Sequence, residues 1–107
     1  MPLTKNFNET IKARLQKSPG FRRALLREAI SSMIAGDLET GKSLLRKYIH
    51  GTIGFARLGE AVGHSSKTLM RMLGPTGNPQ LRNFFEILAY LQKIEGSRLE
   101  VVDKTAA

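Results

Sequence analysis

The chain has 107 residues, a net charge of +8, 41% hydrophobic residues and no cysteine. This length suits one domain whose core needs no disulfide, and the lack of cysteine excludes thiolate metal sites. No apolar run approaches the roughly 20 residues that span a bilayer, so we expect a cytoplasmic protein with no membrane partner. The basic charge favours a polyanionic partner, with nucleic acid ahead of a membrane surface or an acidic protein.

Three helices are predicted in the N-terminal half of the chain. The first covers residues 4–16, the second 21–36 and the third 38–51. In each, apolar residues recur three or four positions apart, which is typical of a helix with one buried face. Asp37 can accept hydrogen bonds from the free N–H groups that open the third helix. The residues expected to face inward are Phe7, Ile11, Leu15, Phe21, Leu25, Leu26, Ala29, Ile30, Met33, Ile34, Leu38, Leu44, Leu45, Tyr48 and Ile49.

The stretch "EAVGHSSKTLMRML" at 60–73 predicts two short helices joined by a tight turn, a helix-turn-helix. We place the first helix at 55–62, with Leu58 and Val62 facing inward. Gly59 lies between them, at the point where the two helices meet, and only a very small side chain allows a close approach there. Gly63 is expected in the turn, because glycine accepts a left-handed backbone.

The second helix of this motif is expected to begin after Ser65, whose hydroxyl can cap it. Leu69, Met72 and Leu73 are predicted to face inward. Short hydrogen-bonding residues, cations and one methionine remain for the outward face: Ser66, Lys67, Thr68, Met70 and Arg71. Such a mixture is typical of a helix that enters a DNA major groove. The alternative is an ordinary helical hairpin with a solvated second helix, but the net charge and the small residue at the crossing favour DNA binding.

The segment "GPTGNPQL" at 74–81 predicts a turn before a last helix. Asn78 is expected to cap this helix and Pro79 to be its first residue, and Gly96 is expected to end it. Residues 97–102 alternate apolar and polar side chains, which indicates a short strand. The residues of the last helix that we expect to face inward are Leu81, Phe84, Phe85, Leu88 and Leu91.

The predicted fold is all-α, with one domain over residues 1–107. Helices in 1–50 precede a helix-turn-helix core in 52–95, and a β-strand follows in 97–102. A lone strand has no partner inside a helical chain, so we expect it to pair with the same strand of a second copy in a two-fold homodimer. The alternatives are packing against the N-terminal segment near Leu3 or an extended, loose segment.

No pattern for catalysis, metal binding or cofactor binding appears. The nine carboxylates are scattered, and His50 and His64 lie on different elements without acidic neighbours at ligand spacing. We therefore expect a non-enzyme without cofactor or metal. Three arginines in the second helix are expected to form a solvated face, with an accessory phosphate patch or a membrane-surface site as alternatives. They are Arg22, Arg23 and Arg27.

The stretch "FARLGEAVGHSSKTLMRMLGPTGNPQLRNFFEILAYLQ", together with "RLEV" after it and "AGDLETGKSLLRKYI" before it, resembles a known family. The family is that of the addiction-module antidote proteins, the antitoxins of the host-inhibition-of-growth type. They belong to the wider Xre-like and lambda-repressor-like helix-turn-helix regulators. The resemblance covers roughly residues 36–102 and is strongest in "LMRMLGPTGNPQL".

This resemblance implies a lambda-repressor-like bundle with extra N-terminal helices here, and a homodimer that binds its own operator and represses transcription. In many members it also implies neutralisation of a small toxin protein encoded nearby. By position, the recognition helix covers residues 66–73 and Ser65 meets phosphate. The implied base-edge contacts are Ser66, Lys67, Thr68 and Arg71. The alternatives are a regulator of the Xre type without a toxin, and a helical protein-interaction module that does not bind DNA.

Overall fold

Local capping groups set where the N-terminal helices begin. In the computed structural model, which describes residues 3–105 and the side chains of residues 9–105, α1 covers Leu3–Lys17, α2 Pro19–Ile34 and α3 Leu38–Gly51. Ser18 Oγ accepts a hydrogen bond from the backbone N–H of Phe21 at 3.1 Å and so caps α2. Asp37 caps α3, and its hydrogen bonds with Thr40 lower the pKa of its carboxyl group. The three predicted N-terminal helices are confirmed.

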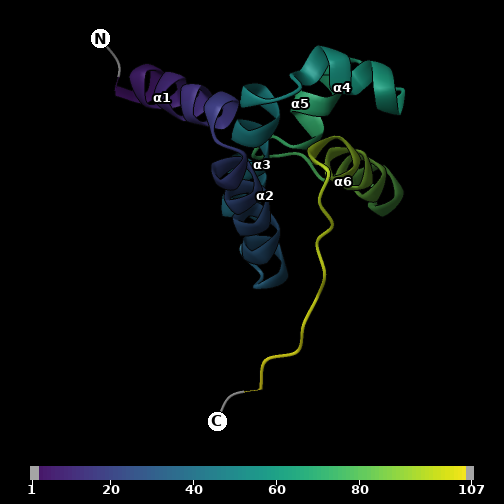
Figure 1. The fold of residues 1–107 in the computed structure, drawn as a ribbon. Helices are drawn as coiled ribbons and strands as arrows, with labels where there is room; N and C mark the ends of the chain where they lie inside the picture. Colours follow the sequence, from purple (N-terminus) through teal and green to yellow (C-terminus); the bar gives the residue numbers. More distant parts are fainter. Residues whose placement is uncertain (1–2, 106–107) are drawn as a thin grey trace.

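The second half of the chain forms α4 (Phe55–Val62), α5 (Ser66–Met72) and α6 (Leu81–Glu95). Figure 1 shows α3 beside α1 and α2, with α4, α5 and α6 grouped on its other side. Helix boundaries at 55–62 and 66–72 agree with those predicted for the helix-turn-helix. Across residues 3–105, no helix is both long and apolar enough to cross a membrane.

One apolar core joins residues from all six helices of the described chain. Its fully or nearly fully buried members include Leu15, Leu26, Ala29, Leu45, Tyr48, Ile49, Leu58, Leu69, Leu73, Ile87, Leu88 and Leu91. Most were expected from helical spacing, and Ile87 was missed. The predicted position of Phe7 lies outside the described side chains.

Four residues that were predicted to face inward are instead exposed to solvent. They are Ile34, Leu38, Leu81 and Phe85. Together with Val101 they border a groove of about 720 Å³ between the end of α2, the start of α3 and the start of α6. Helical spacing identified an apolar face correctly at these positions, but no other element of the described chain covers that face.

The predicted start of α6 at Asn78 and Pro79 is wrong. The helix begins at Leu81, after Gln80 in an extended conformation that makes no side-chain capping bond. The ammonium group of Lys42 on α3 donates to the Gly77 carbonyl at 2.9 Å and to the Pro75 carbonyl at 3.5 Å. These bonds hold the loop against α3, and we attribute the later start of α6 to them.

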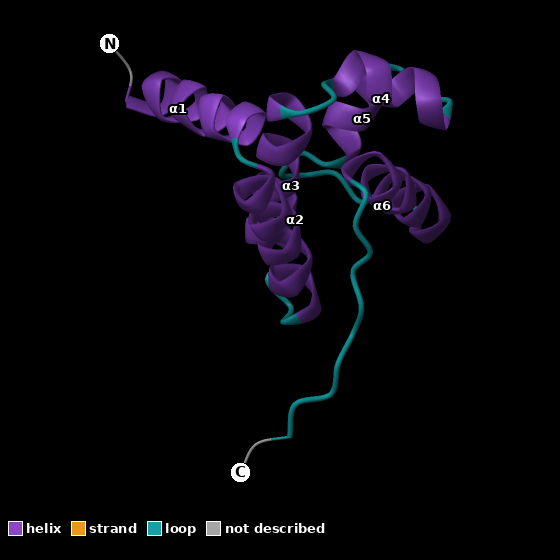
Figure 2. Cartoon of the chain, viewed as in Figure 1, coloured by secondary structure: helices purple, strands orange, loops and turns teal. Residues whose placement is uncertain are grey.

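The strand predicted over residues 97–102 is also wrong, because residues 3–105 contain no strand (Figure 2). The segment after α6 is extended: its residues 99–101 line the groove beside α2 and α6, and the rest runs beyond the helices. Its first residues are fixed by Gln92 on α6, whose side-chain oxygen accepts from the Leu99 N–H at 2.7 Å and whose backbone carbonyl accepts from the Ser97 N–H at 3.2 Å. Gln92 thus satisfies backbone groups that a strand would have paired with another strand.

A buried carboxylate connects the N-terminal helices to α6. Glu95, with only 3% of its side chain exposed, accepts hydrogen bonds from Arg22 Nε at 3.1 Å and from the Tyr48 hydroxyl at 2.6 Å. Arg22 also donates to the Leu15 carbonyl at 2.9 Å. Burial, reinforced by the bond with Glu95, raises the pKa of Tyr48 above its ordinary value. Arg22 is therefore a structural residue and departs from the expected solvated face.

We predict that Glu95→Gln lowers the free energy of unfolding by about 2–3 kcal/mol, because Arg22 would lose its anionic partner in a largely dry site. Urea unfolding followed by circular dichroism measures the change. Glu86→Gln removes the same charge from an exposed position of α6 and is the matched control. Equal unfolding midpoints for the two variants would contradict the structural role of Glu95.

Candidate nucleic-acid interface

The turn between α4 and α5 depends on two glycines with different roles. Gly63 ends α4 in the left-handed region, with φ of +80°, and its N–H donates to the Gly59 carbonyl at 2.8 Å. A Cβ atom on Gly59 would lie 2.2 Å from the His64 carbonyl oxygen. The predicted close approach at Gly59 is confirmed, and the group that approaches it is the backbone of the turn.

Ser65 fixes the start of α5. Its Oγ accepts from the backbone N–H of Thr68 at 3.0 Å and donates to the Thr68 hydroxyl at 2.8 Å. The predicted cap is confirmed. Because Ser65 and Thr68 are bonded to each other, their side chains hold the first turn of α5 in one conformation.

The remaining predicted contact residues lie on the side of α5 away from the core. Lys67 and Arg71 are exposed, one turn apart, and Ser66 is half-buried, while Leu69 is fully buried. Within residues 9–105, neither Lys67 nor Arg71 forms an ion pair. Met70 is also exposed on this helix. The outward face of α5 therefore presents two cations and short hydroxyl groups to solvent, and the helix contains no acidic residue.

The C-terminal end of α5 is held by residues that the sequence did not single out. Arg46 on α3 donates a hydrogen bond to the Leu73 carbonyl, directly after α5. Gly77 packs so closely on the last turn that a Cβ atom there would lie 2.1 Å from the Arg71 carbonyl oxygen. Lys42 in turn holds the Gly77 carbonyl to α3. Both ends of this seven-residue helix are thus fixed by specific contacts.

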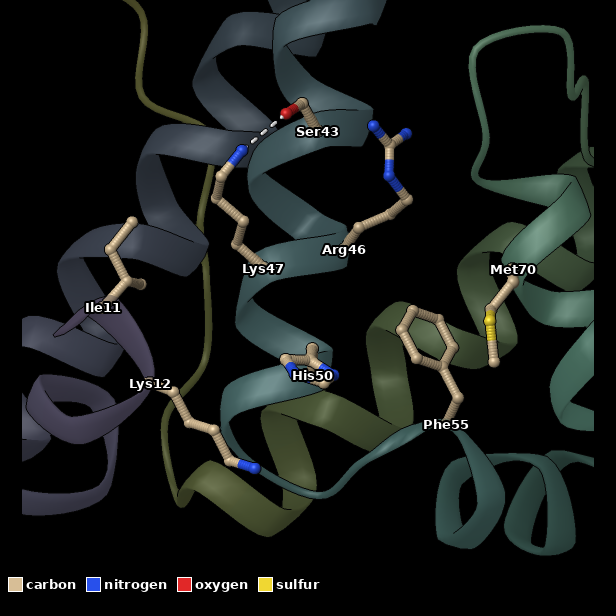
Figure 3. Close-up of a pocket in the computed structure, with 8 residues that line it drawn as sticks. All are labelled: Ile11, Lys12, Ser43, Arg46, Lys47, His50, Phe55 and Met70. Atoms are coloured by element: carbon tan, nitrogen blue, oxygen red, sulfur yellow. Dashed lines mark hydrogen bonds between the residues drawn. The ribbon is translucent and has the colours of Figure 1, made fainter. Parts of the chain in front are cut away.

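A basic groove of about 320 Å³ lies over α3, with α1 on one side and the first residue of α4 and α5 on the other (Figure 3). Its polar lining includes Lys12 from α1 and Ser43, Arg46, Lys47 and His50 from α3. Its far wall includes Phe55, the first residue of α4, and Met70 from α5. Sequence reasoning missed this groove, although Arg46, Lys47 and His50 are spaced to share one face of the third helix in the sequence "RKYIH".

No protein-family model, no curated protein and no solved structure matches this sequence. The contact residues Ser65, Ser66, Lys67, Thr68 and Arg71 therefore remain predictions. What the structure adds is their arrangement on a short helix with fixed ends. The described residues contain no cluster of three histidine or acidic side chains that could hold a metal ion.

We predict that Gly59→Ala lowers the free energy of unfolding by about 1–3 kcal/mol or more, because the new methyl group overlaps the backbone of the turn. The melting temperature measures the effect. Gly20→Ala is the matched control: the nearest atom to its new Cβ would be Ser18 Oγ at 3.9 Å. Alanine is also the better helix former, so this control should be neutral or slightly stabilising. A Gly59→Ala melting temperature equal to that of the wild type would disprove the tight crossing.

Proposed function

We propose that the protein is a sequence-specific DNA-binding transcriptional regulator, a repressor, that places α5 in the major groove. The observation that carries the proposal is the outward face of α5, where Lys67 and Arg71 are exposed on a helix held at both ends. Arginine and lysine side chains recognise guanine in the major groove, and serine and threonine can bond to any base. The net charge of +8 supports binding to a polyanion.

The proposal includes a role as the antitoxin of a toxin–antitoxin module that binds its own operator in the cytoplasm. This part rests on the resemblance over residues 36–102 alone. A stand-alone regulator of the Xre type would use the same face without a toxin partner. Co-expression with the product of the neighbouring reading frame, followed by purification through a tag on this chain, separates the two: a stable complex that relieves growth inhibition supports the antitoxin role.

A protein-interaction module that never touches DNA is the competing function from another class. Such a helix would present large apolar anchors to its partner. On the outward face of α5 only Met70, 49% exposed, is of this type among the described side chains. The polar character of this face therefore favours DNA over a protein partner.

We predict that Arg71→Ala weakens binding to a preferred duplex, selected from a random-sequence pool, by about 1–3 kcal/mol and relaxes the preference at one base pair. Fluorescence anisotropy on the selected and on a scrambled duplex measures both effects. Arg23→Ala, which removes an exposed arginine from α2, is the matched control and should retain the preference. Equal losses on both duplexes would make Arg71 a phosphate contact, and no loss would remove it from the interface.

We further propose that the regulator is a homodimer and that the second copy covers the apolar groove at α2, α3 and α6. Leu81 and Phe85 are 74% and 54% exposed there. The extended segment after α6 runs beyond the helices with Val101 and Val102 84% and 73% exposed (Figure 1). Each copy thus carries both an open apolar groove and an apolar tail, and a two-fold contact would cover both on each copy.

We predict that Phe85→Ser converts the dimer into a monomer, because it removes a large exposed apolar side chain from this face. Light scattering gives the mass in solution, and circular dichroism confirms that the helices remain. Ile94→Ser is the matched control, since Ile94 is a 45% exposed apolar residue of the same helix outside the groove. A wild-type monomer, or a Phe85→Ser variant that stays dimeric, would refute this contact.

A further inference from the structure

We infer that the basic groove over α3, between α1 and α5, binds the DNA phosphate backbone next to the bases that α5 contacts. The inference rests on the proposed function and adds a second, sequence-independent part to the interface. It is carried by three features of the groove: its charge, the neutral partners of its cations and its position beside the outward face of α5.

The groove concentrates positive charge without a counter-charge. Lys12, Arg46 and Lys47 line it together with His50, and no carboxylate is among its lining residues. Elsewhere on α3 the situation differs, because Lys42 lies 3.3 Å from the Glu39 carboxylate. Cations that share one concave surface and have no carboxylate partner raise the local positive potential and attract polyanions.

Two of the groove's cations are held by neutral groups. Lys47 Nζ bonds to Ser43 Oγ at 2.9 Å, and Arg46 donates to the Leu73 carbonyl. Figure 3 shows the first of these bonds, with Lys12 and Lys47 on the α1 side of α3 and Arg46 on the side of Phe55 and Met70. Hydroxyl and carbonyl oxygens orient a cation but leave its full charge. A phosphate oxygen can therefore add a charge-assisted hydrogen bond at each of these side chains.

The groove lies beside the face of α5 that reads the bases in our proposal. Met70, which follows Lys67 by three residues and precedes Arg71, is exposed on α5 and is also a wall residue of the groove. A duplex whose major groove receives α5 has a phosphate backbone on either side of that helix. The cations of α1 and α3 are placed to meet the backbone on the Met70 side. An acidic protein segment is the competing occupant, and it would have no relation to the bases that α5 contacts.

The test is the salt dependence of binding to the selected and the scrambled duplex. Lys12→Gln/Lys47→Gln should lower the affinity for both duplexes by the same factor. Each lost phosphate contact makes the plot of log K against log salt concentration less steep by about 0.9, so the loss of two lysines should lower its steepness by roughly 2. Lys12→Arg/Lys47→Arg keeps the charges and should keep the slope. Lys93→Gln/Lys104→Gln, which removes two exposed lysines outside the groove lining, is the matched control and should leave the slope nearly unchanged.

The outcomes separate the inference from the proposed function. If the wild type prefers the selected duplex but the Lys12→Gln/Lys47→Gln slope equals that of the control, the inference is overturned and the proposed function stands. If the wild type binds no duplex, the proposed function fails and the inference fails with it. If the wild type binds a poly-glutamate peptide at least as tightly as the scrambled duplex, and Lys12→Gln/Lys47→Gln abolishes only peptide binding, the groove is a site for an acidic protein and the phosphate assignment is overturned.

Discussion

The carboxylate of Glu95 is the constraint on which the arrangement of the helices depends. It lies in the last turn of α6, is almost completely buried, and accepts from Arg22 on α2 and Tyr48 on α3. Arg22 reaches further, to the Leu15 carbonyl on α1. An ionised group in such a place is tolerated only when its partners are present, because its desolvation is costly. The carboxylate thus connects α6 to α2 and α3, and Arg22 extends the network to α1.

This constraint matters for α5 because a helix of seven residues is not stable by itself. Its conformation and position must come from its surroundings. Ser65 holds its first turn, Leu69 is buried in the core, and Arg46 and Gly77 hold its end. The network at Glu95 fixes α6 to α2 and α3, and Arg46 fixes the end of α5 to α3. Recognition of bases requires side chains at defined positions, and the network thus supports the geometry that the proposed function needs.

The sequence predicted what local chemistry determines and missed what distant contacts determine. The helices around the turn, the left-handed glycine at Gly63 and the caps at Asp37 and Ser65 followed from neighbouring residues. The start of α6 was misplaced because Lys42, more than thirty residues away, bonds to the loop before it. The strand at 97–102 was wrong because an alternating pattern predicts a strand without providing a partner for it. Of the candidate interface, α5 was found, but the basic groove was not, since it combines residues from separate helices.

The net charge of +8 overstates the charge that a ligand can contact, because some of the cations bind protein oxygens. Arg22 and Lys42 lie largely inside and contact protein oxygens, so they stabilise the fold and are not open to a ligand. Lys67 and Arg71 are exposed and unpaired within the described chain, and they gather on one side of the helix-turn-helix. Arg46 has both roles, since it holds the end of α5 and lines the basic groove. Loss of Arg46 would therefore disturb the position of α5 and the charge beside it together.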